Sequence, residues 1–144
     1  MLIKMKIVDG GKMPEYKTKG AACADCYARL VANVPFITIP KGSRLLVNLG
    51  FALELPEDYE AVIRPRSGNS LKGLCIEIGT IDADYRGEVK ACVVNNTNGD
   101  LQIKNLERIC QMKIQKAEQF PFEIVNELSE TERSDKGFGS TGVS

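Results

Sequence analysis

Hydrophobic and polar residues alternate with a period of two along much of the chain, which is typical of β-strands with one buried face. Residues 3–7 show this pattern most simply, because Ile3, Met5 and Ile7 are separated by lysines. We expect further strands at residues 36–40, 44–55, 59–63, 75–78, 88–94, 101–103 and 109–115. Many short strands separated by turn residues indicate an all-β sandwich or barrel.

The turns and the C-terminal composition divide the chain. Asn98-Gly99 is the strongest turn signal, and it predicts a hairpin over residues 89–102. One helical turn is expected at residues 68–72. Residues 127–144 are acidic at first and then rich in Gly, Ser and Thr, so they cannot build a core. We therefore predict a folded β domain at residues 1–126 and a C-terminal segment at 127–144, which is either a disordered tail or an arm that closes over a ligand.

Composition narrows the possible chemistry. The 144 residues suffice for one domain, and 19 Lys and Arg balance 19 Asp and Glu. This zero net charge argues against a nucleic acid as the partner. The chain contains no histidine, which excludes a Ser-His-Asp triad, a Cys-His pair and a His-ligated zinc site. Acid–base chemistry must come from Asp, Glu, Lys, Tyr or Cys.

The five cysteines and the N-terminal residues indicate an intracellular protein. An odd number of cysteines without a secretory signal favours reduced thiols. No apolar run approaches the roughly 18 residues of a membrane span, so we expect no membrane association. The cytoplasm is the expected location, with the nucleus and the virus-infected cell left open. Cys23 and Cys26 lack the second pair of a zinc site, and we interpret both as small buried apolar side chains.

The glycine-rich segment near the C-terminus is a candidate for binding phosphate. Residues 137–142 formally match G-x-G-x-x-G, but the residues after them leave no room for the helix that this fingerprint needs. They also lack the Gly-Lys-Ser/Thr of a P-loop. Their backbone amides can still wrap an anion, while Ser140, Thr141 and Arg133 add donors and Phe138 adds a flat face for a base. The combination suits a nucleotide.

Three further segments carry polar groups that a structural role or a ligand could explain. In residues 64–68, Ser67 is either the N-cap of a short helix or part of a phosphate site with Arg66 and Gly68. Residues 79–87 are either a polar loop or the source of a general base, for which one of the two aspartates at 82 and 84 is the natural candidate. Alternation along residues 107–112 places Arg108, Cys110 and Met112 on one face of a strand and Ile109 and Gln111 on the other. Gln111 is either an ordinary polar residue of the sheet or a ligand contact.

Five segments together resemble the five ordered motifs of the all-β, trimeric deoxyuridine triphosphate nucleotidohydrolase (dUTPase) family. They read AACADCYA, PRSG, GTIDADYRGEV, ERICQMKI and RSDKGFGSTG, between residues 21 and 142. The resemblance implies a distorted, jelly-roll-like β barrel that forms a homotrimer, in which the arm of one chain covers a site formed by the other two. It also implies hydrolysis of dUTP to dUMP and pyrophosphate with Mg²⁺, which keeps uracil out of DNA and supplies dUMP for thymidylate synthesis.

The resemblance also implies a role for each matching residue. Asp82 would activate the attacking water, Tyr85 would exclude a 2′-hydroxyl, and Asp25 would hold the hydrated Mg²⁺. Uracil would be read by main-chain groups near Gly79, Thr80, Ile81 and Lys90. The phosphates would be bound from the barrel and from the arm, and Phe138 would stack on uracil; the phosphate-binding residues are Arg66, Ser67, Gly68, Gln111, Arg133, Gly139, Ser140 and Thr141.

Departures from the family pattern and two alternative functions accompany this interpretation. Cys23 and Cys26 stand where glycine and leucine are usual, and Asn69 stands where leucine is usual. One alternative is a related dCTP deaminase or a bifunctional deaminase–pyrophosphatase. The other is a trimeric binding or regulatory module in which the nucleotide gates a protein partner.

Overall fold

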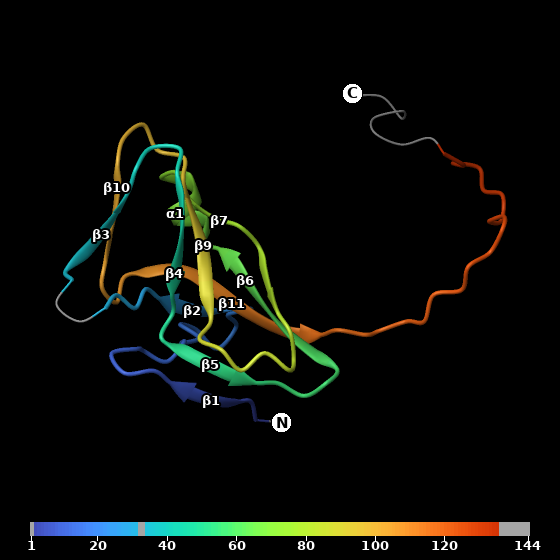
Figure 1. Cartoon of the computed structure of the whole chain (residues 1–144), viewed down its shortest axis with the longest axis horizontal. Coiled ribbons are helices and arrows are strands. Elements are labelled where there is room, and N and C mark those ends of the chain that lie inside the picture. Colours follow the sequence, from blue (N-terminus) through green and yellow to red (C-terminus); the bar gives the residue numbers. More distant parts are fainter. Residues whose placement is uncertain (1, 32–33, 136–144) are drawn as a thin grey trace.

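The structure is a computed structural model that describes residues 2–31 and 34–135 (Figure 1). The described residues form short antiparallel strands and one short helix, which confirms the all-β prediction. Figure 1 shows the strands gathered into one barrel-like body, from which the chain after the last strand runs away. The helix α1 (Ser67–Leu71) lies close to the predicted helical turn.

A four-stranded sheet, in the order β2-β11-β6-β8, positions most of the candidate residues. Its strands are β2 (Ala24–Tyr27), β11 (Arg108–Lys116), β6 (Tyr59–Pro65) and β8 (Gly79–Ile81). Gln111 pairs with Asp25 on one side and with Arg64 on the other, so polar residues of three strands form a row on one face. The opposite face contributes Cys26, Met112 and Ile63 to the core.

The other strands form smaller sheets. A three-stranded sheet has the order β4-β9-β7, and the remaining strands pair as β1-β5 and β10-β3. The bounds are β1 (Lys4–Ile7), β3 (Phe36–Ile39), β4 (Arg44–Asn48), β5 (Phe51–Glu54), β7 (Leu74–Ile76), β9 (Lys90–Asn95) and β10 (Leu101–Lys104).

The prediction of a hairpin around Asn98-Gly99 is wrong. β9 pairs with β4 and β7, whereas β10 leaves for β3, so the two strands do not pair with each other. The fully buried Asn95 explains the divergence. Its Nδ2 donates to the carbonyl oxygens of Ile39 and Gly99, each at 2.8 Å, and its Oδ1 accepts from the Thr97 amide at 2.9 Å. These bonds direct the turn toward β3.

The single run predicted at residues 44–55 is two strands. It breaks after Asn48, and β5 leaves to pair with β1. Gly50 has φ +78°, a left-handed conformation that favours glycine. Gly11 lies against it, and a Cβ on Gly11 would fall 2.1 Å from the Gly50 carbonyl oxygen. The bend therefore depends on this glycine pair.

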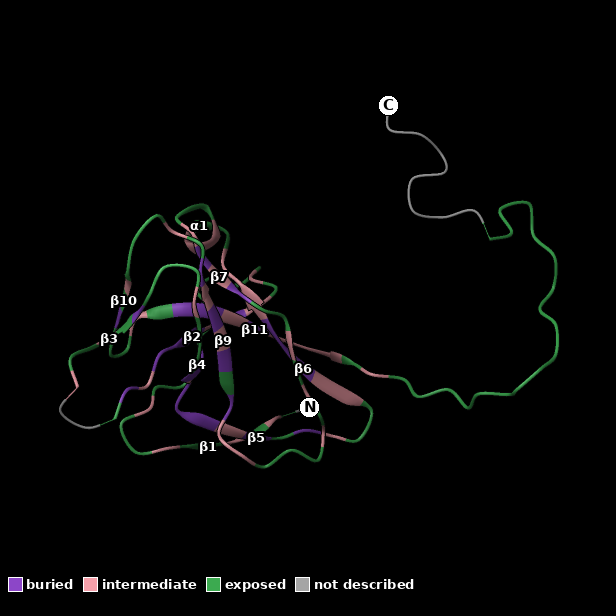
Figure 2. Ribbon diagram, turned by 45° about the horizontal axis from the view of Figure 1, so that its top comes forward, coloured by how far each residue is buried: buried purple, intermediate pink, exposed green. Residues whose placement is uncertain are grey.

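Buried and exposed residues divide the chain in the way that the composition suggests. Figure 2 shows many of the buried positions in the strands of the body. Leu49, Phe51, Ile63 and Ile103 are among the fully buried side chains. Residues 118–135 are all exposed. The division at residues 126 and 127 stays a prediction.

No helix in the described ranges has the length and apolarity that crossing a membrane requires.

Candidate functional site

The carboxylate of Asp25 lies at the centre of a charged cluster. Its Oδ1 accepts from Arg66 Nε at 3.1 Å, and its Oδ2 accepts from Arg108 Nη1 at 3.0 Å. The Asp25 side chain is only 13% exposed. Two guanidinium groups against one carboxylate leave an excess of one positive charge, so the cluster attracts an anion.

The sequence after β6 brings three predicted phosphate ligands to this cluster. Arg66 is the N-cap of α1 and has extended backbone angles, so Ser67 is the first helical residue. The interpretation of Ser67 as the N-cap is therefore wrong. Ser67 and Gly68 are exposed. Because the first amides of a helix have no partner within it, both backbone N–H groups are available to a ligand.

Gln111 ties the central strand to the same loop. Its Nε2 donates to the carbonyl oxygen of Pro65 at 2.8 Å, immediately before Arg66. The side chain is half-buried in the row between Asp25 and Arg64. The structure therefore brings Asp25, Arg66 and Gln111 together.

Arg108 was not predicted as a site residue, because β11 does not alternate strictly. Its pairing with β2 shifts register between Arg108 and Cys110, which is a β-bulge. Consequently Ile109, Cys110 and Met112 are all buried, whereas Arg108 remains outside and reaches Asp25. The predicted grouping of Ile109 with Gln111, and of Arg108 with Cys110, is wrong. A buried apolar pair at 109 and 110 is the signal that could have indicated the bulge.

The loop that follows β8 holds Asp82 and Tyr85. Asp82 is exposed, and its carbonyl oxygen accepts from the Tyr85 amide at 3.1 Å, which closes a turn. Tyr85 Oη donates to the Glu88 carbonyl oxygen at 3.2 Å. The ring lies on Gly87, where a Cβ would fall 2.3 Å from Tyr85 Oη. The local backbone therefore fixes the direction of this aromatic side chain.

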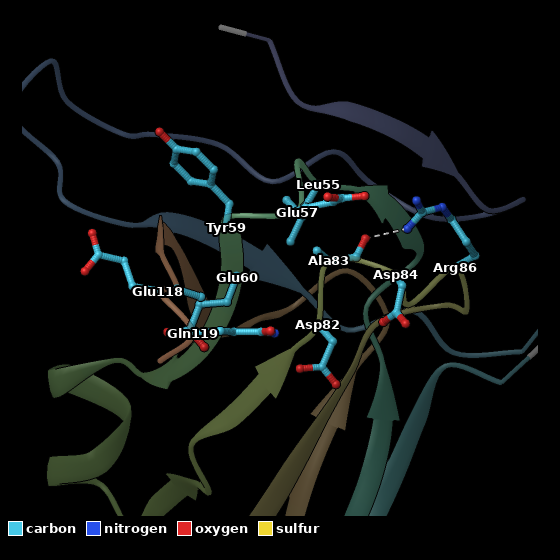
Figure 3. Close-up of a pocket in the computed structure, with 11 residues that line it drawn as sticks. Leu55, Glu57, Tyr59, Glu60, Asp82, Ala83, Asp84, Arg86, Glu118 and Gln119 are labelled. Atoms are coloured by element: carbon cyan, nitrogen blue, oxygen red, sulfur yellow. Dashed lines mark hydrogen bonds between the residues drawn. The ribbon is translucent and has the colours of Figure 1, made fainter. Parts of the chain in front are cut away.

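Asp82 borders a cleft of about 680 Å³ (Figure 3). Arg86 lies on its rim and donates to the Ala83 carbonyl oxygen at 2.6 Å. The other charged residues that line the cleft are the carboxylates of Glu57, Glu60, Asp82, Asp84 and Glu118. This concentration of negative charge does not suit a triphosphate.

The base candidate and the phosphate cluster lie at opposite ends of the β6–β8 pairing. Ile81, just before Asp82, pairs with Ala61, whereas Arg66 follows Pro65 at the far end of β6. Ala61 and Pro65 are about 13 Å apart at the rise of a strand. One chain therefore does not bring Asp82 to Arg66.

The remaining candidates lie in the sheets or in the C-terminal segment. Gly79, Thr80 and Ile81 form β8, and Lys90 is the first residue of β9, where it pairs with Asn48. Arg133 is exposed in the segment after β11. Phe138, Gly139, Ser140 and Thr141 fall outside the described residues.

The cysteines near Asp25 differ in burial. Cys26 is fully buried and pairs across the strands with Cys110, whereas Cys23 is half-buried, so the prediction of two buried thiols is right only for Cys26. Hydrogen bonding to Cys110 and burial raise the pKa of Cys26. Cys23, which stands where the family usually has glycine, does not have the positive φ that would favour glycine there.

Among the described residues, no three or more Cys, Asp or Glu side chains are placed so that they could hold a metal ion together.

Comparisons with known proteins agree on one family. A family model described as dUTPase matches residues 9–142. The chain is 43% identical to the deoxyuridine 5′-triphosphate nucleotidohydrolase of Finegoldia magna, covering 97% of this chain and 99% of that protein. It is 45% identical to the protein of the same name from Rickettsia bellii strain OSU 85-389, covering 98% and 95%. The dUTPase of Staphylococcus bacteriophage 80alpha, solved with dUpNHpp, is 26% identical with a TM-score of 0.89 over 99% of both chains. This likeness confirms the expected jelly-roll-like barrel.

Proposed function

The chain belongs to the dUTPase family, and from this premise we propose that it hydrolyses dUTP to dUMP and pyrophosphate. The observation that carries the proposal is the Asp25–Arg66–Arg108 cluster with Gln111 beside it. It offers a positively charged, partly buried surface of the kind that binds a phosphate chain. The proposed reaction would supply dUMP for thymidylate synthesis and would keep uracil out of DNA.

Phosphate oxygens would be held by groups that the structure already orients. Arg66 supplies a guanidinium fixed by Asp25, and Ser67 and Gly68 supply the amides at the start of α1. Gln111 presents a side-chain amide anchored on Pro65. Because these donors are positioned before the ligand arrives, binding costs little reorganisation.

The carboxylate of Asp25 has acceptor sites left for the water molecules of a hydrated Mg²⁺. Magnesium keeps several waters and takes few protein ligands. A carboxylate can accept about four hydrogen bonds, and the two arginines occupy one site on each Asp25 oxygen. Asp25 can therefore also accept hydrogen bonds from water bound to the metal. When bound, the ion would neutralise charge on the triphosphate.

Asp82 would act as the general base for the attacking water. Its carboxylate accepts the proton while the water oxygen bonds to the α-phosphorus. The bond between that phosphorus and the bridging oxygen breaks, and pyrophosphate leaves. Arg86 is the one cation among the described residues that line the cleft beside Asp82, so the charges that bind the triphosphate would come from a second surface.

The same loop would recognise the nucleoside. The Tyr85 ring, held by Gly87 and the Glu88 carbonyl, would pack on the deoxyribose and leave no room for a 2′-hydroxyl. Main-chain groups of Gly79, Thr80 and Ile81, with those near Lys90, would pair with uracil. Cytosine presents the reverse donor and acceptor pattern, which would leave buried partners unpaired.

We further propose that the site forms between copies in a homotrimer. The separation of Asp82 from Arg66 within one chain supports this assembly. Arg64 supports it too, because its Nε is buried without a hydrogen-bond partner in the part of the chain that the structure describes. The exposed segment after β11, which carries Arg133, would close as an arm over a neighbour's site, with Phe138, Gly139, Ser140 and Thr141 at the nucleotide.

The comparisons favour neither alternative function. The relatives carry the dUTP nucleotidohydrolase name. Ammonia release from dCTP would be the result that supports a dCTP deaminase or a bifunctional enzyme instead. A nucleotide-gated binding module would require a protein partner that a non-hydrolysable analogue displaces. The five cysteines form no disulfide in the part of the chain that the structure describes, which supports our proposal of a cytoplasmic location.

The test is pyrophosphate release with Mg²⁺ from dUTP, dTTP, dCTP and UTP, with the products identified. We expect release from dUTP, with dUMP as the product. Asp82→Asn should lower kcat by at least about a hundredfold while leaving dUpNHpp binding intact. Asp84→Asn, which changes the neighbouring carboxylate of the same cleft, is the matched control and should retain activity. Full turnover by Asp82→Asn would reject Asp82 as the base.

A further inference from the structure

At the bulge in β11, two backbone carbonyl oxygens accept hydrogen bonds from a side chain. The register shift falls between Arg108 and Cys110, and pairing with β6 begins only at Cys110. A bulge disrupts the ladder of backbone hydrogen bonds at the inserted residue. The carbonyl oxygens of Arg108 and Ile109 lie at this irregularity and take side-chain donors.

Asn69 supplies those donors from the first turn of α1. Its Nδ2 lies 3.0 Å from the Arg108 carbonyl oxygen and 3.1 Å from that of Ile109. A side-chain amide nitrogen carries two hydrogens, so one group can serve both acceptors. Arg66 Nη1 also donates to the Arg108 carbonyl oxygen, at 3.2 Å.

Burial does not hold α1 in place. The helix has five residues, none of them buried, and no side chain caps its N-terminus. A helix this short is not stable by itself and depends on tertiary contacts. Asn69 lies one position after Gly68, so its two hydrogen bonds set the position of the amides at the start of the helix.

We propose that Asn69 is a positioning residue for phosphate binding, which holds the Arg66–Ser67–Gly68 turn against Asp25 and Arg108. The inference rests on the proposed function, because that turn is where the triphosphate would bind. Asn69 itself does not touch the substrate. It acts by joining the helix to the bulge, and through the Arg108 backbone it couples the two arginines that share Asp25.

The test removes the bridge without weakening the helix. Asn69→Ala deletes both donors and introduces a strong helix former, and Asn69→Leu deletes them at similar size. The matched control is Ser70→Ala, which changes the next residue of α1 and leaves both Asn69 hydrogen bonds in place. We would measure Kd by calorimetry for dUpNHpp and for inorganic triphosphate, and by NMR titration for deoxyuridine, which carries no phosphate. KM and kcat for dUTP complete the set.

Asn69→Ala and Asn69→Leu should weaken dUpNHpp and triphosphate by about tenfold each, because misplaced donors lose most of their hydrogen-bond energy. KM should rise with them, while deoxyuridine affinity stays within about twofold and Ser70→Ala matches the wild type. Unchanged triphosphate affinity, or an equal loss for deoxyuridine, would overturn the inference. A wild-type protein that binds triphosphate without binding dUpNHpp or hydrolysing dUTP would reject the proposed function alone, and the triphosphate comparison would still decide the role of Asn69. Failure to bind either probe would reject both.

Discussion

Gly87 shows how one residue without a side chain determines the place of another. Tyr85 folds over it, and its Oη donates to the Glu88 carbonyl oxygen at 3.2 Å. A Cβ at position 87 would overlap the ring, at 2.5 Å from Tyr85 Cζ. The Tyr85 ring must therefore move if any other amino acid replaces Gly87.

Gly87→Ala should reduce discrimination against the 2′-hydroxyl, because a displaced Tyr85 no longer fills that space. We expect the ratio of kcat/KM for dUTP to that for UTP to fall by about tenfold or more. Gly99→Ala is the control, since a Cβ there meets open space. An unchanged ratio in Gly87→Ala would mean that the Tyr85 ring does not select the sugar.

The buried cysteine pair should be chemically inert in the native protein. Hydrogen bonding to Cys110 and burial raise the pKa of Cys26, which disfavours the reactive thiolate. Labelling with a thiol reagent followed by peptide mapping should find Cys23 and Cys75, which are half-buried, modified well before Cys26 and Cys110. All five thiols should react in denaturant. Equal native labelling rates would show that the core near Asp25 opens readily.

At the scale of elements, the alternating pattern located most strands but not their partners or their irregularities. β2 and β8 were missed because Ala24, Asp25 and Gly79 are residue types that are depleted in strands. The Asn98-Gly99 signal marks a real turn, but it cannot reveal that the side chain of Asn95 sends β10 to β3. The bulge that exposes Arg108 is likewise invisible to a rule of strict alternation.

A part-buried ion pair joins three segments near the loop that carries Tyr85. Glu88 accepts from Arg29 Nε and Nη2, each at 2.6 Å, and from the Gly50 amide at 3.0 Å. The two side chains are 16% and 17% exposed. Hydrogen bonding to Arg29 lowers the pKa of Glu88 below its ordinary value. The folded state therefore favours the carboxylate form.

The pair should contribute stability that is lost in acid. Because the folded-state pKa of Glu88 is depressed, its contribution is complete above the unfolded value of about 4.3 and disappears as the pH falls through the folded value. Glu88→Gln should lower the free energy of unfolding by about 2 kcal/mol near neutral pH and flatten its decline in acid. Urea titrations at neutral and acidic pH measure both effects. In the exposed Lys4–Glu54 pair, Glu54→Gln should lower the free energy of unfolding far less than Glu88→Gln does. Equal losses in the two variants would contradict this account.

At the scale of the whole molecule, the motifs mark candidate site residues but do not show how these residues meet. Asp25, Arg66 and Gln111 converge within one chain, whereas Asp82 lies past the other end of the β6–β8 pairing. No pattern along one chain records a contact between copies. Our proposal of a site shared between copies therefore rests on the family resemblance and on the separation of Asp82 from Arg66 within one chain.

Two inactive variants should restore each other if the site is shared between copies. Arg66→Ala removes a phosphate donor and Asp82→Asn removes the base, so each homotrimer should be nearly inactive. In a mixture unfolded together and refolded, some sites would pair an intact Arg66 from one copy with an intact Asp82 from another. Random assembly of equal amounts predicts about a quarter of wild-type activity per site. Mixing the two variants without unfolding is the control, and it should give none until subunits exchange. If the refolded mixture stays inactive while refolded wild type recovers, Arg66 and Asp82 must serve the same site from a single chain, and the proposed assembly is wrong.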